Sequence, residues 1–113
     1  MTTSTLLLLA LAIAAPASSP ARPAPGPRTH KVDIRAFAVQ PARLEVAAGD
    51  KVEWTNRDIV PHTATSADGS WDAGELAGGR SGSVVVAKAG TFDYFCRFHP
   101  SMKGALVVAA PGR

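Results

Sequence analysis

The chain has 113 residues, a length that predicts one folded domain. Its formal net charge is +3. Arg22 and Arg28 lie in the N-terminal part, and from Thr29 onward ten Lys and Arg stand against nine Asp and Glu. This balance excludes the clustered basic surface of a nucleic-acid-binding protein, so we expect no nucleic-acid partner.

The N-terminal part contains an apolar run over residues 6–15. The run is shorter than the ~20 residues that a membrane-spanning helix needs, and it has the length of a signal-peptide core. Small residues follow it, as signal peptidase requires, although no Lys or Arg precedes it. We predict a signal peptide over residues 1–17, cleaved between positions 15 and 22, and hence an exported, periplasmic protein. An uncleaved membrane tether is the alternative.

Residues 18–28 are rich in Pro and Ala and contain no large apolar side chain. This composition predicts a linker, followed by a folded domain over 29–110 and a tail over 111–113. A domain of this size has a marginal core, and small exported domains usually depend on disulfides. Cys96 is the only cysteine and cannot form a disulfide within the chain, so a bound metal is the expected substitute.

Short segments with alternating apolar side chains run through the domain, which is typical of half-buried β-strands. In the first segment, alternate residues from Val32 to Ala38 share one face. The segments predicted as strands are 31–39, 43–46, 51–55, 62–66, 83–87, 91–96 and 106–108. Gly, Asp, Ser and Thr dominate residues 56–82, which predicts a long loop around the strand at 62–66. The pattern, with no amphipathic helix, predicts an all-β antiparallel sandwich or barrel.

Three potential metal ligands, Cys96, His99 and Met102, follow one another at a spacing of three residues. A loop of this length can place a thiolate, an imidazole and a thioether around one point. These soft donors suit copper and do not suit calcium or magnesium. A blue-copper site needs a second imidazole, and His62 is the available candidate. The sequence therefore predicts a copper site formed by His62, Cys96, His99 and Met102.

Segments 60–63, 71–76 and 94–104 resemble the plastocyanin branch of the cupredoxins, which are blue copper proteins. The short loop from Cys96 to Met102 is similar to that of amicyanin, since plastocyanin and pseudoazurin have more residues between the second His and the Met. The resemblance covers Thr29 to Ala110. It implies a Greek-key β-sandwich with one copper ion between loops at one end.

The resemblance also implies coordination through Nδ1 of His62 and of His99, the sulfur of Cys96 and a weak axial bond from the sulfur of Met102. Many relatives carry Asn directly after the first His ligand, where its amide helps to hold the loops together. Here that residue is Thr63. The sequence leaves open whether the Thr63 hydroxyl makes this hydrogen bond, which would also affect the copper potential.

A copper ion held by four side chains has no open position for a substrate. We therefore predict an electron carrier that is not an enzyme and has no small-molecule substrate. The resemblance implies that His99 lies nearest the surface and exchanges electrons with redox proteins, such as a dehydrogenase or a c-type cytochrome. We expect a monomer that meets these partners through small, weak interfaces.

The residues around His99 define the expected docking surface. Phe98 and Pro100 are expected to form its apolar rim, together with Ala105, while Arg97 and Lys103 add positive charge that would attract an acidic partner.

Two other functions are compatible with the sequence. A copper-delivery or storage protein would use the same soft ligands, but it would tend to contain more Met and His, whereas Met102 is the only Met besides the initiator. A metal-free sandwich that serves in adhesion or as an interaction module is the second alternative. It predicts that replacing Cys96 by Ser changes no measurable behaviour.

Overall fold

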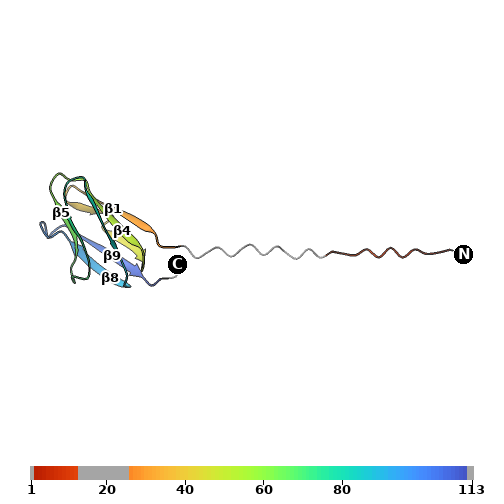
Figure 1. Ribbon diagram of the computed structural model, residues 1–113. Helices are drawn as coiled ribbons and strands as arrows, with labels where there is room; N and C mark the ends of the chain where they lie inside the picture. Colours follow the sequence, from red (N-terminus) through yellow and green to blue (C-terminus); the bar gives the residue numbers. More distant parts are fainter. Residues whose placement is uncertain (1, 13–25, 112–113) are drawn as a thin grey trace.

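The computed structural model describes residues 2–12 and 26–111, in which nine β-strands form and no helix is present. The strands are β1 (Thr29–Arg35), β2 (Ala38–Gln40), β3 (Arg43–Ala47), β4 (Lys51–Asn56), β5 (His62–Ser66), β6 (Asp72–Leu76), β7 (Ser81–Val85), β8 (Gly90–Phe95) and β9 (Lys103–Ala109). They form two β-sheets that face each other (Figure 1). The predicted all-β sandwich is confirmed.

Both sheets are mixed: most neighbouring strands pair antiparallel, as predicted, and one pair in each sheet is parallel. The four-stranded sheet has the order β2-β1-β4-β7, with β1 and β4 parallel. The five-stranded sheet has the order β3-β9-β8-β5-β6, with β3 and β9 parallel. The chain leaves the first sheet after β2, adds β3 to the second sheet and returns to place β4 beside β1. Two parallel strands are joined by a crossover, so they lie far apart in the sequence. The alternation of side chains within one strand therefore does not predict its parallel partner.

The segment 31–39, predicted as one strand, is a hairpin in which β1 and β2 pair antiparallel. Ala36 and Phe37 form its turn, with φ angles of 51° and 59°. A two-residue turn with both φ angles positive matches the twist of the flanking strands, and Asn-Gly is its usual sequence. Ala-Phe carries no such turn signal, which is why alternation alone predicted a continuous strand. The reversal brings Val39, in place of Ala38, into the core.

The other predicted strands are confirmed as β3, β4, β5, β7, β8 and β9, with ends that differ by at most three residues. Strand β6 lies in the segment that was predicted to be a loop. Its five residues include Gly74, whose φ is 85°, and they lack alternating apolar side chains. Pairing with β5 therefore forms this strand against its local preference.

Three aromatic side chains join the two sheets in the core. Trp54 on β4 stacks on Trp71 with ring centroids 5.4 Å apart, and it meets Tyr94 on β8 edge-on at 5.5 Å. Trp54 and Tyr94 are buried, and Trp71 is half-buried. The rings thereby fix β4 against β8. The loop after β4 leads to His62, the first residue of β5, and the loop after β8 carries the other three predicted ligands.

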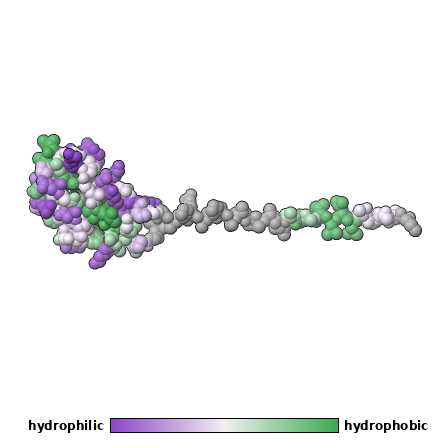
Figure 2. Space-filling model, in the orientation of Figure 1, coloured by the Kyte–Doolittle hydropathy of each residue, from purple (hydrophilic) through white to green (hydrophobic). Residues whose placement is uncertain are grey.

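Residues 2–12 contain no helix or strand, and the apolar side chains from Leu6 to Leu11 are exposed (Figure 2). No helix in the described part of the chain is long and apolar enough to cross a membrane. Positions 13–17 of the predicted signal peptide and 18–25 of the predicted linker lie outside the described residues. Both assignments therefore stay predictions.

Gly104 on β9 pairs with Tyr94 on β8, and an added Cβ would clash with Cζ and Oη of the Tyr94 ring. We predict that Gly104→Ala lowers the free energy of unfolding by about 1–3 kcal/mol, as overpacking does, measured by urea unfolding. Gly26→Ala is the matched control, because nothing lies within 4 Å of its added Cβ. Equal stability of Gly104→Ala and the wild type would contradict this packing.

Candidate metal centre

The predicted ligands lie at one end of the sandwich, where three segments meet. His62 begins β5, and the loop between β8 and β9 carries Cys96, His99 and Met102. The β1–β2 turn adds Phe37, whose ring contacts both imidazoles. Strand ends from both sheets thus converge on the predicted site.

Two consecutive turns shape the loop between β8 and β9. The carbonyl of Cys96 accepts the His99 N–H at 3.2 Å, and the carbonyl of His99 accepts the Met102 N–H at 2.8 Å. The Cys96 N–H donates to the carbonyl of Met102 at 3.0 Å and closes the loop. Because each turn spans four residues, the spacing of three places a predicted ligand at both ends of each turn.

His62 and Cys96 form the best-defined pair of the centre. Both side chains are fully buried, and Nδ1 of His62 lies 3.7 Å from Sγ of Cys96. The sulfur also accepts the backbone N–H of Thr63 at 3.3 Å. A hydrogen bond to a cysteine sulfur is one of the contacts that tune the potential of a copper–thiolate site.

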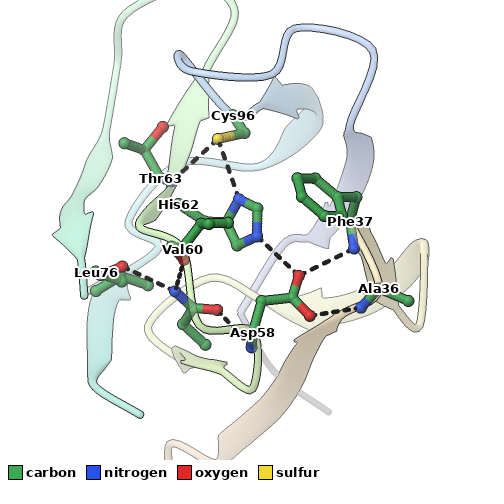
Figure 3. Close-up of polar contacts among 9 residues, drawn as sticks. Ala36, Phe37, Asp58, Val60, His62, Thr63, Leu76 and Cys96 are labelled. Atoms are coloured by element: carbon green, nitrogen blue, oxygen red, sulfur yellow. Dashed lines mark hydrogen bonds and ion pairs between the residues drawn. The ribbon is translucent and has the colours of Figure 1, made fainter. Parts of the chain in front are cut away.

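The other ring nitrogen of His62 is held by Asp58, as Figure 3 shows. Nε2 lies 2.8 Å from Oδ2 of Asp58. The Phe37 N–H lowers the pKa of Asp58 most, the His62 ring and the Ala36 N–H lower it further, and burial opposes them. An ionised carboxylate only accepts hydrogen bonds, so His62 Nε2 is the donor to Asp58, and Nδ1 is the ring nitrogen that faces Cys96.

Asn56 holds the β4–β5 loop around Asp58. It is fully buried, and its side chain donates to the carbonyls of Val60 and Leu76 at 2.8 and 2.9 Å. Its Oδ1 accepts the Asp58 N–H at 2.9 Å. Sequence reasoning missed both Asn56 and Asp58. The burial of Asn56 was predictable, because Asn56 continues the apolar face formed by Val52 and Trp54. No local pattern predicted a role for Asp58.

The Thr63 hydroxyl makes two hydrogen bonds in this structure. Its Oγ1 accepts the backbone N–H of Arg97 at 2.8 Å and lies 3.0 Å from Oγ1 of Thr65. Thr63 is buried and joins the start of β5 to the loop that follows Cys96. The hydroxyl therefore ties together the two segments that carry His62 and Cys96.

His99 and Met102, the other two predicted ligands, are less closely tied to the pair of His62 and Cys96. The ring centroid of His99 lies 5.3 Å from that of His62, and His99 is half-buried. Met102 is 3% exposed and belongs to the same buried cluster as Cys96. Within residues 2–12 and 26–111, no group of three or more His, Cys, Asp and Glu side chains is arranged to hold an ion. The structure thus brings His62 and Cys96 together and places His99 beside them.

The geometry of the His62–Cys96 pair fits a shared metal ion. Metal–nitrogen bonds of about 2.0–2.1 Å and metal–sulfur bonds of about 2.3 Å, as for zinc, put such ligands roughly 3.6–3.8 Å apart at tetrahedral to trigonal angles. The observed separation is 3.7 Å. The donor set of imidazole, thiolate and thioether favours copper among the metals that take such ligands.

Comparisons with known proteins identify the family of the chain. A family profile described as "Cupredoxin-like domain" matches residues 4–108. Amicyanin from Paracoccus denitrificans is 35% identical over 82 residues, which cover 68% of this chain and 63% of that relative, so the chain spans less than two thirds of its length.

Two solved structures show the same fold. A methionine-to-alanine variant of amicyanin with Cu(I) is 29% identical, with a TM-score of 0.66 and coverage of 71% of this chain and 81% of that chain. A copper-containing nitrite reductase from Thermus scotoductus is 26% identical with a TM-score of 0.67, over 74% of this chain but only 23% of that chain.

Thr63→Val removes the acceptor of the Arg97 N–H without changing the shape of the side chain. We predict a loss of about 1–2 kcal/mol in the free energy of unfolding, because the hydroxyl makes two hydrogen bonds, to Arg97 and to Thr65. Urea unfolding of the metal-free protein measures this loss. Thr55→Val is the matched control, because the Thr55 hydroxyl bonds Ser81 at the surface. If both variants lose the same stability, the Thr63 hydroxyl does not hold the loops together.

Proposed function

Because the chain belongs to the cupredoxin-like family, we propose that it binds one copper ion through His62, Cys96, His99 and Met102 and carries single electrons between redox proteins. The observation that carries this proposal is the buried pair of His62 Nδ1 and Cys96 Sγ, 3.7 Å apart. Copper, when bound, supplies the one-electron Cu(II)/Cu(I) couple. The chain supplies the ligands, keeps water away from them and limits their movement.

A carrier fits this centre better than an enzyme. Four side-chain ligands leave no position open for a substrate, whereas catalytic metal sites keep one. The similarity to a nitrite reductase involves less than a quarter of that chain. It therefore supports a shared copper-binding fold and not a shared reaction.

Copper delivery or storage is the second candidate function. Such a protein releases its ion readily and benefits from exposed ligands. Here His62, Cys96 and Met102 are all at most 3% exposed. The rate at which a chelator removes copper separates the two functions, and slow removal favours the carrier.

The surface beside His99 has the properties of an electron-transfer interface. His99 is half-buried, whereas the other three predicted ligands are buried. Three exposed apolar side chains lie on the segments that surround the centre: Phe37, Ile59 and Phe98 are 52, 97 and 46% exposed. Figure 2 shows apolar surface among hydrophilic residues at the left-hand end of the domain. A small apolar contact of this kind suits short-lived encounters with a redox protein.

Positive charge beside the centre is partly neutralised. The Arg97 guanidinium lies 3.7 Å from the carboxylate of Asp72, and both side chains are exposed. Lys103 follows the ligand loop directly and is also exposed. We assign Lys103 the larger part in attracting an acidic partner, because an exposed ion pair contributes little net field.

The proposal for cellular location rests on the N-terminal sequence. A signal peptide over 1–17 and a linker over 18–28 would deliver the domain of residues 29–110 to the periplasm as a monomer. An exported location also agrees with a single cysteine that serves as a metal ligand, since an idle thiol is open to oxidation in that compartment.

Addition of Cu(II) to the metal-free protein tests the copper site. We expect one equivalent to produce intense visible absorption from thiolate-to-copper charge transfer, together with a narrow copper hyperfine splitting. Cys96→Ser should remove the absorption, because the hydroxyl is a poor replacement for the thiolate. Ser101→Ala, in the same loop, is the matched control and should keep it. Absence of the band in the wild type at full copper occupancy contradicts the proposal.

The ionic strength of the solution tests the role of Lys103. We expect the rate of electron transfer with an acidic redox protein to fall as salt is added, because screening weakens the attraction. Lys103→Gln should lower the rate at low salt and flatten its salt dependence, while Lys88→Gln, outside the ligand loops, should change neither. A wild-type rate that does not depend on salt rules out electrostatic attraction.

A further inference from the structure

The β1–β2 turn holds an unfavourable conformation beside the proposed copper centre. Ala36 and Phe37 both lie in the left-handed region, where residues with a Cβ are uncommon. Phe37 is also 52% exposed, although its side chain is apolar. Strain of this kind persists only where neighbouring contacts maintain it, and it is frequent at functional sites. The contacts of Phe37 therefore indicate what the turn does.

The Phe37 ring contacts both imidazoles of the proposed centre. Its centroid lies 5.3 Å from that of His62 at an interplanar angle of 85°, and 5.0 Å from that of His99 at 81°. The ring centroids of the two imidazoles are 5.3 Å apart. Phe37, His62 and His99 thus form a ring triad in which each ring meets the other two edge-on. Such arrangements are favourable beyond the area they bury.

One carboxylate fixes two members of this triad relative to each other. Asp58 accepts the N–H groups of Ala36 and Phe37 at 2.7 and 3.0 Å, and the same Oδ2 that accepts from Phe37 lies 2.8 Å from His62 Nε2 (Figure 3). His99 is the third member. In the described part of the chain its ring makes no hydrogen bond, so the contacts with Phe37 and His62 position it.

We propose that Phe37 is a positioning residue of the copper centre, whose ring, anchored by Asp58 through the backbone of the β1–β2 turn, holds the His99 imidazole in place before copper binds. This inference rests on the proposed function, because it assigns Phe37 a role toward two of the proposed ligands. It concerns a third segment of the chain, which supplies no ligand itself.

The physical effect is preorganisation. His99 lies on a loop at the surface, and without the Phe37 ring its imidazole is free to adopt several rotamers that copper binding must then restrict. With the ring in place, the second imidazole stays near His62 in the metal-free protein. The same contact restricts the movement of His99 when the oxidation state of the metal changes.

The test compares Phe37→Leu, which removes the aromatic ring, with Phe37→Tyr, which keeps it. In metal-free wild type, NMR should show nuclear Overhauser effects between the Phe37 ring and the His99 imidazole. Phe37→Leu should remove the ring-current shifts of the His99 protons and lower the affinity for Cu(I) roughly 2- to 13-fold, the factor that corresponds to one edge-to-face pair. Phe37→Tyr should keep both the ring-current shifts and the affinity for Cu(I). Phe92→Leu, away from the centre, is the control for a general loss of stability.

The outcomes separate this inference from the proposed function. Absence of the Phe37–His99 Overhauser effects in the wild type overturns the inference and needs no variant to fold. Unchanged Cu(I) affinity in Phe37→Leu also overturns it. A wild type that shows the Overhauser effects but develops no charge-transfer band with Cu(II) leaves the ring triad intact and overturns the proposed function instead.

Discussion

The complete burial of His62 and Cys96 is the constraint on which the centre depends. Burying a polar group costs free energy unless the group has a partner, and here each polar atom of the two side chains has one. Asp58 holds Nε2 of His62, the Thr63 N–H reaches the sulfur, and Nδ1 faces that sulfur at 3.7 Å. Asn56 supports this arrangement, because its side chain makes hydrogen bonds to the backbone of the β4–β5 loop and of β6. Removing any one of these contacts leaves a buried polar atom unpaired in a small domain whose core has little stability to spare.

The sheets and the loops each contribute to the geometry of this centre. Trp54, Trp71 and Tyr94 lock the two sheets together, so strand ends from both sheets keep a fixed separation. The ligand loop is then closed by its own backbone hydrogen bonds between Cys96 and Met102. A site built in this way changes shape little, which suits one-electron transfer, since each change in ligand geometry adds to the barrier.

The sequence predicted the parts of the molecule that depend on local patterns. Strands β3, β4 and β8 follow from alternation. Donor chemistry and spacing singled out the four potential ligands, whose assignment stays a proposal. Three features depend on contacts between distant segments and were not predictable in this way: the parallel pairs, the turn at Ala36 and Phe37, and the role of Asp58. The Ala-Phe turn has no composition that marks it, and it is maintained by a carboxylate more than twenty residues away.

The direction of the outer strands has a consequence for attachment. β1 runs from Thr29 toward the turn beside the centre, and β9 runs from the ligand loop to Ala109. The chain therefore enters and leaves the sandwich at the end opposite the ligands (Figure 1), about 20 Å away for a seven-residue strand. Immobilising the domain on an electrode, or fusing it to another protein, through either terminus would leave the end of the sandwich that carries His99 pointing outward and uncovered.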